Sequence, residues 1–396
     1  VLGFDVDPAK AESIANRQSY FAHIADARIS AAVDCGLAVT TNIARTAECD
    51  AIIICVPTPL GSHQEPDLSF ITGTMESLIN YLRPGQVICL ESTTYPGTTD
   101  EEIVPRAELA GLNVGEEVFV VYSPEREDPG NQTFHTQTIP KVVGGVTPSC
   151  LEVGEVLYGQ VIDEVVSVSS TRAAEMTKLL ENIHRAVNIG LVNELKMVTD
   201  KMGIDIFEVI NAAASKPFGF TPYYPGPGLG GHCIPIDPFY LTWKAKEYGV
   251  HTRFIELAGE VNTAMPQWVI SKIEQALNDR CKAVNGSRIL IIGVAYKKET
   301  NDTRESPGLE IYASLEKRGA VVSYHDPFVS VLPVTRQHAL AGTSVSLNSA
   351  NIASQDCVLI CTDHSNIEYE VILNNASLIV DTRGVFDADG TTIVLA

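Results

Sequence analysis

One short segment, PGPGLGGHCIPID (Pro225 to Asp237), combines the residue types that nucleophilic catalysis requires. Its single cysteine, Cys233, precedes Asp237 by four positions and follows four closely spaced glycines, Gly226, Gly228, Gly230 and Gly231. Glycine lets backbone amides approach a ligand closely, and such amides together with a nearby lysine lower the pKa of a thiol toward the reactive range. The segment therefore offers Cys233 as a candidate nucleophile and Asp237 as a hydrogen-bonding base.

Other interpretations of this segment stay open. Free cysteine is among the most deeply buried residue types, so Cys233 could be a structural thiol in a glycine-rich turn. The adjacent His232 suggests a cysteine–histidine hydrolase, although neighbouring side chains rarely face each other. The glycine run follows no predicted strand and opens no predicted helix, which argues against a dinucleotide-binding loop.

A second set of polar residues lies on one long predicted helix. The apolar periodicity predicts this helix over 171–202, with Gly203 as its C-cap and a length of about 45 Å. Lys178, Asn182 and Arg185 fall at positions i, i+4 and i+7, so they share one face. This face is either a solvated polar stripe or a covered functional face, because apolar residues occupy much of the remaining circumference.

Further candidates follow predicted strands, where open α/β sheets bind their ligands. Asp5 ends an early strand, the position of a carboxylate that holds an adenosine ribose, and the segments 56–59 (VPTP) and 91–99 (ESTTYPGTT) offer hydroxyl groups. The segment 296–307 (YKKETNDTRESP) offers Lys297, Lys298 and Arg304 to phosphate groups. Plain turns and a solvated basic loop are the alternatives.

The elements that must position these residues alternate between strand and helix at both ends of the chain. Such alternation predicts an α/β fold with two doubly wound, Rossmann-like domains. The middle third is helical. We therefore expect three domains: 1–170 and 269–396 with doubly wound sheets, and a central helical domain, 171–268, that contains the long helix.

Composition limits the possible partners and surroundings. The chain has 396 residues with 28 basic against 49 acidic side chains, and its net charge of −21 disfavours nucleic acid and anionic membranes. Its nine cysteines are scattered singly, which favours a reducing cytoplasm over a disulfide framework, and no metal site is expected. No apolar run reaches the ~20 residues of a membrane helix, so we expect a soluble protein.

Four motifs, in this order along the chain, resemble those of the UDP-glucose/GDP-mannose dehydrogenase family. They are SPERE, the K-x-x-x-N pair formed by Lys178 and Asn182, GGHCIPIDP and KKETNDTRES. The resemblance covers essentially the whole chain. SPEREDPGN together with the histidine before Cys233 is similar to the branch that oxidises UDP-N-acetylglucosamine, whereas a GGSC-type loop is usual in the UDP-glucose branch.

The resemblance implies a four-electron oxidation of the 6-hydroxyl of a UDP-sugar by two NAD+, for surface polysaccharide synthesis. It assigns Cys233 to a thiohemiacetal and then a thioester, and Lys178 and Asn182 to oxyanion stabilisation. Asp237 and Thr93 would handle a proton and an ordered water. Glu125 would be the base in thioester hydrolysis.

The resemblance also implies binding residues and an assembly. It assigns NAD binding to Asp5, Lys10, Thr58, Thr93 and Arg304. It assigns the UDP-sugar to Arg126, Glu127, Lys178, Asn182, Arg185, Gly230, Tyr296 and Lys297. The central helices would form a homodimer. One departure is that the first strand and glycine loop of the N-terminal domain are absent, which we interpret as a truncated chain that lacks its pyrophosphate site.

The choice of substrate and of functional class stays open. UDP-N-acetylmannosamine and UDP-glucose are alternative substrates within the family. A non-catalytic UDP-sugar-binding protein is the alternative of another class, and it is disfavoured because Cys233, Lys178, Asn182 and Asp237 are all present.

Overall fold

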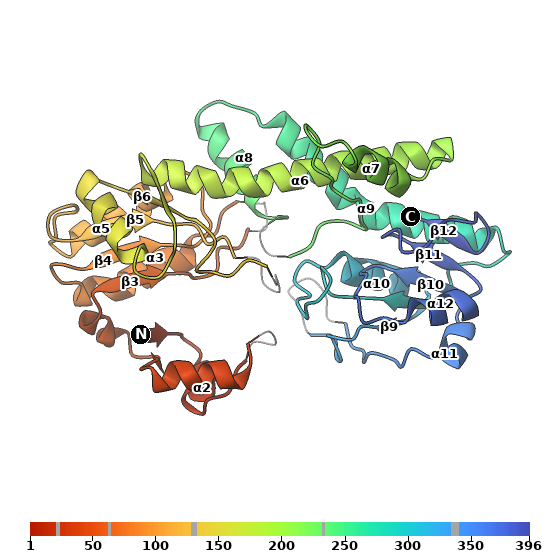
Figure 1. The fold of residues 1–396 in the computed structure, drawn as a ribbon, viewed down its shortest axis with the longest axis horizontal. Helices are drawn as coiled ribbons and strands as arrows, with labels where there is room; N and C mark the ends of the chain where they lie inside the picture. The colour runs from red at the N-terminus through yellow and green to blue at the C-terminus, as the bar shows by residue number, and fades with distance from the viewer. Residues whose placement is uncertain (21–23, 62–64, 128–132, 232–233, 334–339) are drawn as a thin grey trace. The chain divides into compact units, whose positions relative to one another are not determined.

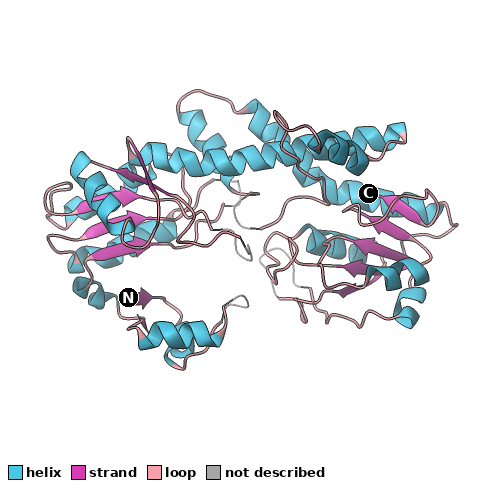
Figure 2. Ribbon diagram, viewed as in Figure 1, coloured by secondary structure: helices cyan, strands magenta, loops and turns pink. Residues whose placement is uncertain are grey.

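The computed structural model describes residues 1–20, 24–61, 65–127, 133–231, 234–333 and 340–396. Within these residues the chain forms two compact units, Val1–Asn182 with Phe239–His251 and Ile183–Pro238 with Thr252–Ala396. Each unit contains a sheet flanked by helices (Figures 1 and 2). The expected α/β class is therefore confirmed.

The first unit is built on a five-stranded sheet in the order β3-β4-β5-β6-β7. The strands are β3 (Ala51–Ile54), β4 (Val87–Leu90), β5 (Phe119–Tyr122), β6 (Lys141–Gly145) and β7 (Val165–Val168). All neighbours run parallel except β5 and β6, which pair antiparallel. The alternation of strands and helices predicts parallel strands throughout, so the reversed direction of β6 and β7 departs from that expectation.

The remaining elements of the first unit include a separate two-stranded parallel sheet, β1 (Leu2–Phe4) with β2 (Ala38–Thr40). The helical segments are α1 (Pro8–Ala15), α2 (Asp26–Asp34), η1 (Ile43–Glu48), α3 (Ser69–Leu78), η2 (Ile79–Tyr81), the π-helix η3 (Thr99–Ile103), α4 (Val104–Leu109) and α5 (Pro148–Tyr158). Side chains of α3 and α4 pack on one face of the five-stranded sheet, and those of α5 pack on the other. This arrangement forms because successive strand residues point to opposite faces.

The middle of the chain is helical, as its periodicity predicts. Helix α6 spans Thr171–Met202, the predicted range, and Gly203 ends it with φ +68°, the left-handed conformation that a C-cap glycine adopts. It is followed by α7 (Ile206–Ala214), α8 (Asp237–Glu247) and α9 (Arg253–Asn278). None of the described helices combines the length and the apolar character that crossing a bilayer requires.

The second unit contains a five-stranded parallel sheet in the order β12-β11-β10-β8-β9. Its elements are β8 (Arg288–Ile292), α10 (Pro307–Lys317), β9 (Val321–His325), α11 (Ser349–Ala353), β10 (Cys357–Ile360), α12 (Tyr369–Asn375), β11 (Ile379–Asp381) and β12 (Ile393–Leu395). Helices α9 and α10 cover one face, and α11 and α12 cover the other. The chain leaves β8 toward β9 and returns to β10 on the opposite side, so the topological switch point lies between β8 and β10.

Candidate active site

Glu125 lies in the loop that follows β5, and its carboxylate is the centre of a polar cluster in the first unit. Oxygen Oε1 accepts hydrogen bonds from the main-chain N–H groups of Arg126 (2.7 Å) and Glu127 (2.6 Å). Oxygen Oε2 lies 3.2 Å from the Nζ atom of Lys141. Local turn geometry and one buried cation thus hold this carboxylate.

Lys141 reaches Glu125 because β6 runs antiparallel to β5. The first residue of β6 therefore lies beside the carboxyl ends of β4 and β5, where Glu91 and Glu125 follow. Its Nζ atom lies 3.1 Å from Oε1 of Glu91, and the same oxygen accepts a 2.5 Å hydrogen bond from the hydroxyl of Tyr158. A single lysine therefore joins two carboxylates at this edge of the sheet.

The charges of this cluster keep Glu125 ionised. Burial raises the pKa of Glu125, but the attraction of Lys141 and the two N–H donors outweigh burial and leave the pKa below its usual value. Burial lowers the pKa of Lys141, but the two carboxylates outweigh it and leave that pKa raised. Burial also raises the pKa of Tyr158, so the phenol stays neutral and donates to Glu91. An ionised carboxylate beside solvent can act as a general base.

Helix α6 carries Lys178, Asn182 and Arg185, whose spacing predicts a shared polar face. The Nζ atom of Lys178 donates a 2.5 Å hydrogen bond to the main-chain carbonyl oxygen of Glu125, so this lysine lies directly beside the candidate base. Asn182, one turn further along the helix, is buried. Arg185 is exposed.

The beginning of α6 is fastened to the loop that follows β4. Glu175 is fully buried, and its carboxylate accepts hydrogen bonds from the N–H of Gly97 (2.6 Å), the N–H of Thr99 (2.8 Å) and the hydroxyl of Thr99 (2.7 Å). Burial raises the pKa of Glu175 to about 7. The segment that contains Thr93 is thus attached to the helix that contains Lys178.

The strand ends of the first unit offer groups that fit a dinucleotide. The carboxylate of Asp5, just after β1, is partly exposed and pairs with Lys10 at 2.9 Å. Thr58 and Thr93 follow the neighbouring strands β3 and β4; Thr58 is buried and its carbonyl oxygen accepts a 2.9 Å hydrogen bond from the hydroxyl of Tyr240. The hydroxyl of Thr94 is buried and has no hydrogen-bond partner among the described residues.

The glycine loop belongs to the second unit, where neighbouring segments leave no room for side chains. The N–H of Gly226 donates to Oδ1 of Asn193 (3.0 Å), and Gly228 and Gly231 have φ angles of +138° and +84°. A Cβ atom at Gly230 would lie 2.6 Å from Cβ of Tyr296. Glycine is therefore required here for close approach as well as for conformation.

Two of the predicted residues of this loop lie outside the described residues, and a third is described. Cys233, the candidate nucleophile, and His232 are not among the residues that the structure describes. Asp237 is described. It is the first residue of α8 and its side chain is buried.

The segment 296–305 follows β8 at the switch point of the second sheet. The guanidinium group of Arg304 makes hydrogen bonds of 2.7–3.1 Å to both carboxylate oxygens of Asp302. The Nζ atom of Lys297 lies 5.9 Å from the centre of the Tyr296 ring. Basic side chains and an aromatic ring thus gather where doubly wound sheets bind nucleotides.

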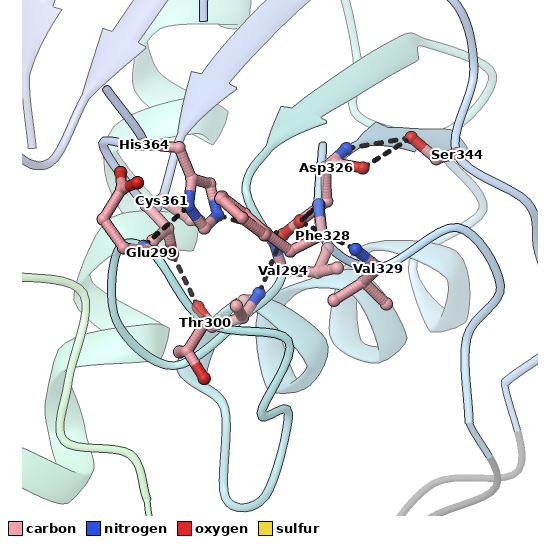
Figure 3. A network of polar contacts seen from close by, with 12 residues as sticks. Val294, Glu299, Thr300, Asp326, Phe328, Val329, Ser344, Cys361 and His364 are labelled. Atoms are coloured by element: carbon pink, nitrogen blue, oxygen red, sulfur yellow. Dashed lines mark hydrogen bonds and ion pairs between the residues drawn. The ribbon is translucent and has the colours of Figure 1, made fainter. Parts of the chain in front are cut away.

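A buried network contacts this segment (Figure 3). The carboxylate of Asp326, after β9, accepts hydrogen bonds from the N–H groups of Val294 (2.7 Å) and Ala295 (3.0 Å) and lies 3.3 Å from Nε2 of His364. The other ring nitrogen of His364 accepts from the N–H of Glu299 at 3.1 Å. This pattern assigns the proton of a neutral His364 to Nε2, and it links the ends of β8, β9 and β10.

The structure brings some of the predicted residues together within each unit. Glu125, Arg126, Glu127 and Lys178 are neighbours in the first unit, where Arg126 also pairs with Glu181 at 2.6 Å. In the second unit Gly230, Tyr296 and Arg304 are adjacent. Asp5 and Lys10 form a pair of their own.

Sequence reasoning missed the buried residues behind these groups, Glu91, Lys141, Tyr158, Asp326 and His364. The one available signal was position, because Glu91, Asp326 and His364 each follow a predicted strand. Among the described residues no group of three or more metal-ligating side chains lies together.

Comparison with known families gives three matches that together cover most of the chain. The models of the UDP-glucose/GDP-mannose dehydrogenase family match at residues 1–162 (NAD binding domain), 172–264 (central domain) and 290–388 (UDP binding domain).

Individual relatives agree with these matches. A UDP-N-acetyl-D-glucosamine 6-dehydrogenase of Pseudomonas aeruginosa is 33% identical over 93% of this chain and 86% of its own length. An NDP-N-acetyl-D-galactosaminuronic acid dehydrogenase of Ralstonia nicotianae is 32% identical over 98% of this chain and 91% of its own. The structure of a UDP-D-ManNAc dehydrogenase from Pyrococcus horikoshii superposes with a TM-score of 0.88 at 30% identity, covering 100% of this chain and 93% of that one.

Proposed function

The chain belongs to the UDP-glucose/GDP-mannose dehydrogenase family, and we propose that it oxidises the 6-hydroxyl of a UDP-N-acetylhexosamine to the uronic acid. It is an NAD-dependent oxidoreductase of nucleotide sugars. We propose UDP-N-acetylglucosamine as the substrate, which the Pseudomonas aeruginosa relative and the SPEREDPGN motif support.

In the proposed reaction the alcohol and one water molecule are converted to the carboxylate. Together they give up two hydrides and three protons. NAD+ accepts the hydride in each of the two oxidations. Between them the thiol of Cys233 adds to the aldehyde carbon, which retains the reactive intermediate as a thiohemiacetal. The second oxidation gives a thioester, and water then releases the carboxylate and restores the thiol.

Four further residues and Glu125 have separate roles in this scheme. Lys178 and Asn182 donate hydrogen bonds to the developing oxyanion, a contribution of a few kcal/mol per donor in comparable sites. Glu125 takes the proton from the attacking water in thioester hydrolysis. Thr93 orients that water, and Asp237 assists the first proton transfer.

One observation carries the proposal, the ionised Glu125 held beside Lys178. Lys141 and two main-chain N–H groups lower the pKa of Glu125, and the carbonyl oxygen of the same residue accepts from Nζ of Lys178 at 2.5 Å. Hydrolysis of a thioester needs a base that is unprotonated at neutral pH beside a cation that stabilises the oxyanion. These two residues supply both.

The proposed binding residues come from the N-terminal, central and C-terminal parts of the chain. We assign NAD to Asp5, Lys10, Thr58, Thr93 and Arg304. We assign the UDP-sugar to Arg126, Glu127, Lys178, Asn182, Arg185, Gly230, Tyr296 and Lys297. We propose domains at 1–170, 171–268 and 269–396.

We also propose a homodimer formed through the central helical domain. Four exposed apolar residues of α6, Leu191, Leu195, Val198 and Met202, support this assembly because their spacing puts them on one face of the helix. A second copy of the same helix would cover such a stripe.

The experiment that tests the function uses the whole chain with NAD+ and a panel of UDP-sugars. The panel contains UDP-N-acetylglucosamine, UDP-N-acetylmannosamine, UDP-N-acetylgalactosamine and UDP-glucose, because the relatives are named for different N-acetylhexosamines. Mass spectrometry should find a product 14 Da heavier than the substrate, the uronic acid, with about two NADH per product. Binding of a UDP-sugar without any NADH would instead support a non-catalytic binding protein.

A further inference from the structure

Lys141 is a buried cation between two carboxylates of unequal exposure. Its side chain is 8% exposed, that of Glu91 is 12% exposed and that of Glu125 is 47% exposed. The Nζ atom lies 3.1 Å from Glu91 and 3.2 Å from Glu125. Glu91 thus belongs to the interior and Glu125 to the surface, and Lys141 connects them.

The interior side of this bridge is held by further contacts. Oε1 of Glu91 accepts the hydroxyl of Tyr158 at 2.5 Å, and that hydroxyl lies 2.9 Å from Sγ of Cys89. The Nζ atom of Lys141 also lies 5.3 Å from the centre of the Tyr158 ring. Because the ammonium group is held by Glu91 and Tyr158, it offers a fixed partner to the more exposed carboxylate, that of Glu125.

Several charged or titratable groups surround Glu125. Glu91 after β4 and Cys55 after β3 belong to the neighbouring strands, and burial raises the pKa of Cys55 so that its thiol is neutral. Tyr158 of α5 lies behind Lys141. From α6, Lys178 contacts the Glu125 main chain, and Glu181 is paired with Arg126.

Within this set, Lys141 is the side-chain cation that contacts the Glu125 carboxylate directly. Removing Lys141 would also leave Glu91 and Glu125 as two like charges without the cation between them. Two neighbouring carboxylates without a shared cation raise each other's pKa. The protonation of Glu125 therefore depends on Lys141 as well as on its own backbone contacts.

We propose that Lys141 is a positioning residue for thioester hydrolysis, which holds the carboxylate of Glu125 in place and ionised by bridging it to Glu91. This inference rests on the proposed function, in which Glu125 is the hydrolytic base. It assigns Lys141 no contact with the substrate. The two oxidation steps, which do not use Glu125, should be less affected than hydrolysis.

The test compares wild type with Lys141→Met, which keeps an unbranched side chain of similar length, one atom shorter, and removes its charge. The UDP-sugar that wild type oxidises is mixed with excess NAD+, and the acyl-enzyme is measured by intact-protein mass spectrometry after acid quench. In Lys141→Met the acyl-enzyme should accumulate and its hydrolysis at pH 7 should slow by about tenfold or more. In a plot of the hydrolysis rate against pH, the acidic limb should shift to higher pH by about one to three pH units.

A second variant, Glu91→Gln, should shift the acidic limb of the pH–rate profile in the opposite direction. Glu91→Gln leaves Glu125 as the remaining carboxylate on Lys141, so the acidic limb should move to lower pH. Lys141→Arg, which keeps the charge, should restore most of the wild-type profile. Should Lys141→Met not fold, Glu91→Gln and Lys141→Arg still give a result that supports or contradicts the proposal.

The matched control is Lys244→Met. Lys244 is also a buried lysine between two glutamates, Glu101 at 2.9 Å and Glu247 at 2.8 Å, and it lies 4.6 Å from the ring centre of Tyr95. Its loss should lower stability without moving the acidic limb. Equal profiles in wild type, Lys141→Met and Glu91→Gln would overturn the inference, whereas a wild type that forms no NADH with any UDP-sugar would overturn the proposed function itself.

Discussion

The N–H of Gly231 donates a 2.9 Å hydrogen bond to the carbonyl oxygen of Arg304, which ties the glycine loop to the segment after β8. The contact is tight over several atoms. A Cβ atom at Gly230 would meet Cβ of Tyr296 at 2.6 Å, and the carbonyl oxygen of Glu305 at 2.9 Å. The glycines therefore hold together two loops that the sequence separates by about seventy residues.

Gly230→Ala should separate these loops. The added methyl group cannot be accommodated by a flexible side chain, because one of its neighbours is main chain, so we expect a loss of about 1–3 kcal/mol of stability. UDP binding, measured by calorimetric titration, should weaken as Tyr296 is displaced. The control is Gly73→Ala in α3, where a Cβ atom would meet nothing within 4 Å and stability should be unchanged or raised. Equal UDP affinity in wild type and Gly230→Ala would contradict the assignment of this contact to binding.

Glu175→Gln should change how stability depends on pH. Burial raises the pKa of Glu175 to about 7, above the value of 4.5 for an unperturbed glutamate. Between these values the folded protein binds a proton that the unfolded chain has lost. The neutral Glu175 side chain therefore contributes its full stabilisation below pH 4.5, and this contribution to the free energy of unfolding is lost as the pH rises through 7. The fall corresponds to about 3 kcal/mol.

Thermal unfolding of both proteins between pH 4.5 and pH 8 measures this pH dependence of stability. The wild type should lose stability relative to Glu175→Gln, because glutamine does not ionise. Glutamine offers a single acceptor oxygen to the N–H groups of Gly97 and Thr99. The free energy of unfolding of Glu175→Gln should therefore be lower than that of wild type at acidic pH by about 1–3 kcal/mol. Parallel curves for the two proteins would show that Glu175 ionises normally in the folded state.

The sequence predicted local structure well and tertiary neighbours poorly. Helix α6 and its cap at Gly203 were predicted because apolar periodicity and a terminal glycine are local signals. The antiparallel direction of β6 was not predicted, since strand direction depends on the path of the whole chain. Lys141 was missed for the same reason, because a lysine at the start of an apolar strand gives no sign that it will be buried between two carboxylates.

The apolar stripe on α6 predicts that the oligomer can be disrupted without disturbing either sheet. Leu191→Glu combined with Leu195→Glu places two charges in a stripe that a second copy would cover. We expect a dimeric wild type and a monomeric variant in light scattering coupled to size exclusion. Leu109→Glu, at an exposed leucine of α4, is the control and should stay dimeric. A monomeric wild type would remove the proposed assembly.

Discrimination between substrates should depend on the N-acetyl group. UDP-N-acetylglucosamine should have a higher kcat/KM than UDP-glucose by about 10- to 100-fold, which corresponds to about 1–3 kcal/mol, the range that one substituent in a fitted pocket provides. Initial rates of NADH formation at several concentrations of each sugar give this ratio. A ratio below one would place the chain with the UDP-glucose enzymes of its family.

The last prediction concerns the covalent step and rests on the sequence alone, because Cys233 lies outside the described residues. Serine is a weaker nucleophile toward the aldehyde and forms an ester in place of a thioester, so Cys233→Ser should lose nearly all formation of uronic acid. UDP binding should be retained, since the residues assigned to it are unchanged. Cys281→Ser is the matched control, because Cys281 is an exposed free thiol in the second unit and should be dispensable.

Intact-protein mass spectrometry during turnover separates the possible outcomes of this prediction. Wild type and Cys281→Ser should both carry the acyl adduct, and peptide mapping should place it on Cys233. In Cys233→Ser the thioester should be missing while the affinity for UDP stays within about twofold, because a nucleophile contributes to the transition state far more than to ground-state binding. Full conversion to the uronic acid by Cys233→Ser would show that the aldehyde is oxidised without capture by sulfur, and Cys233 would then be a structural thiol of the glycine loop.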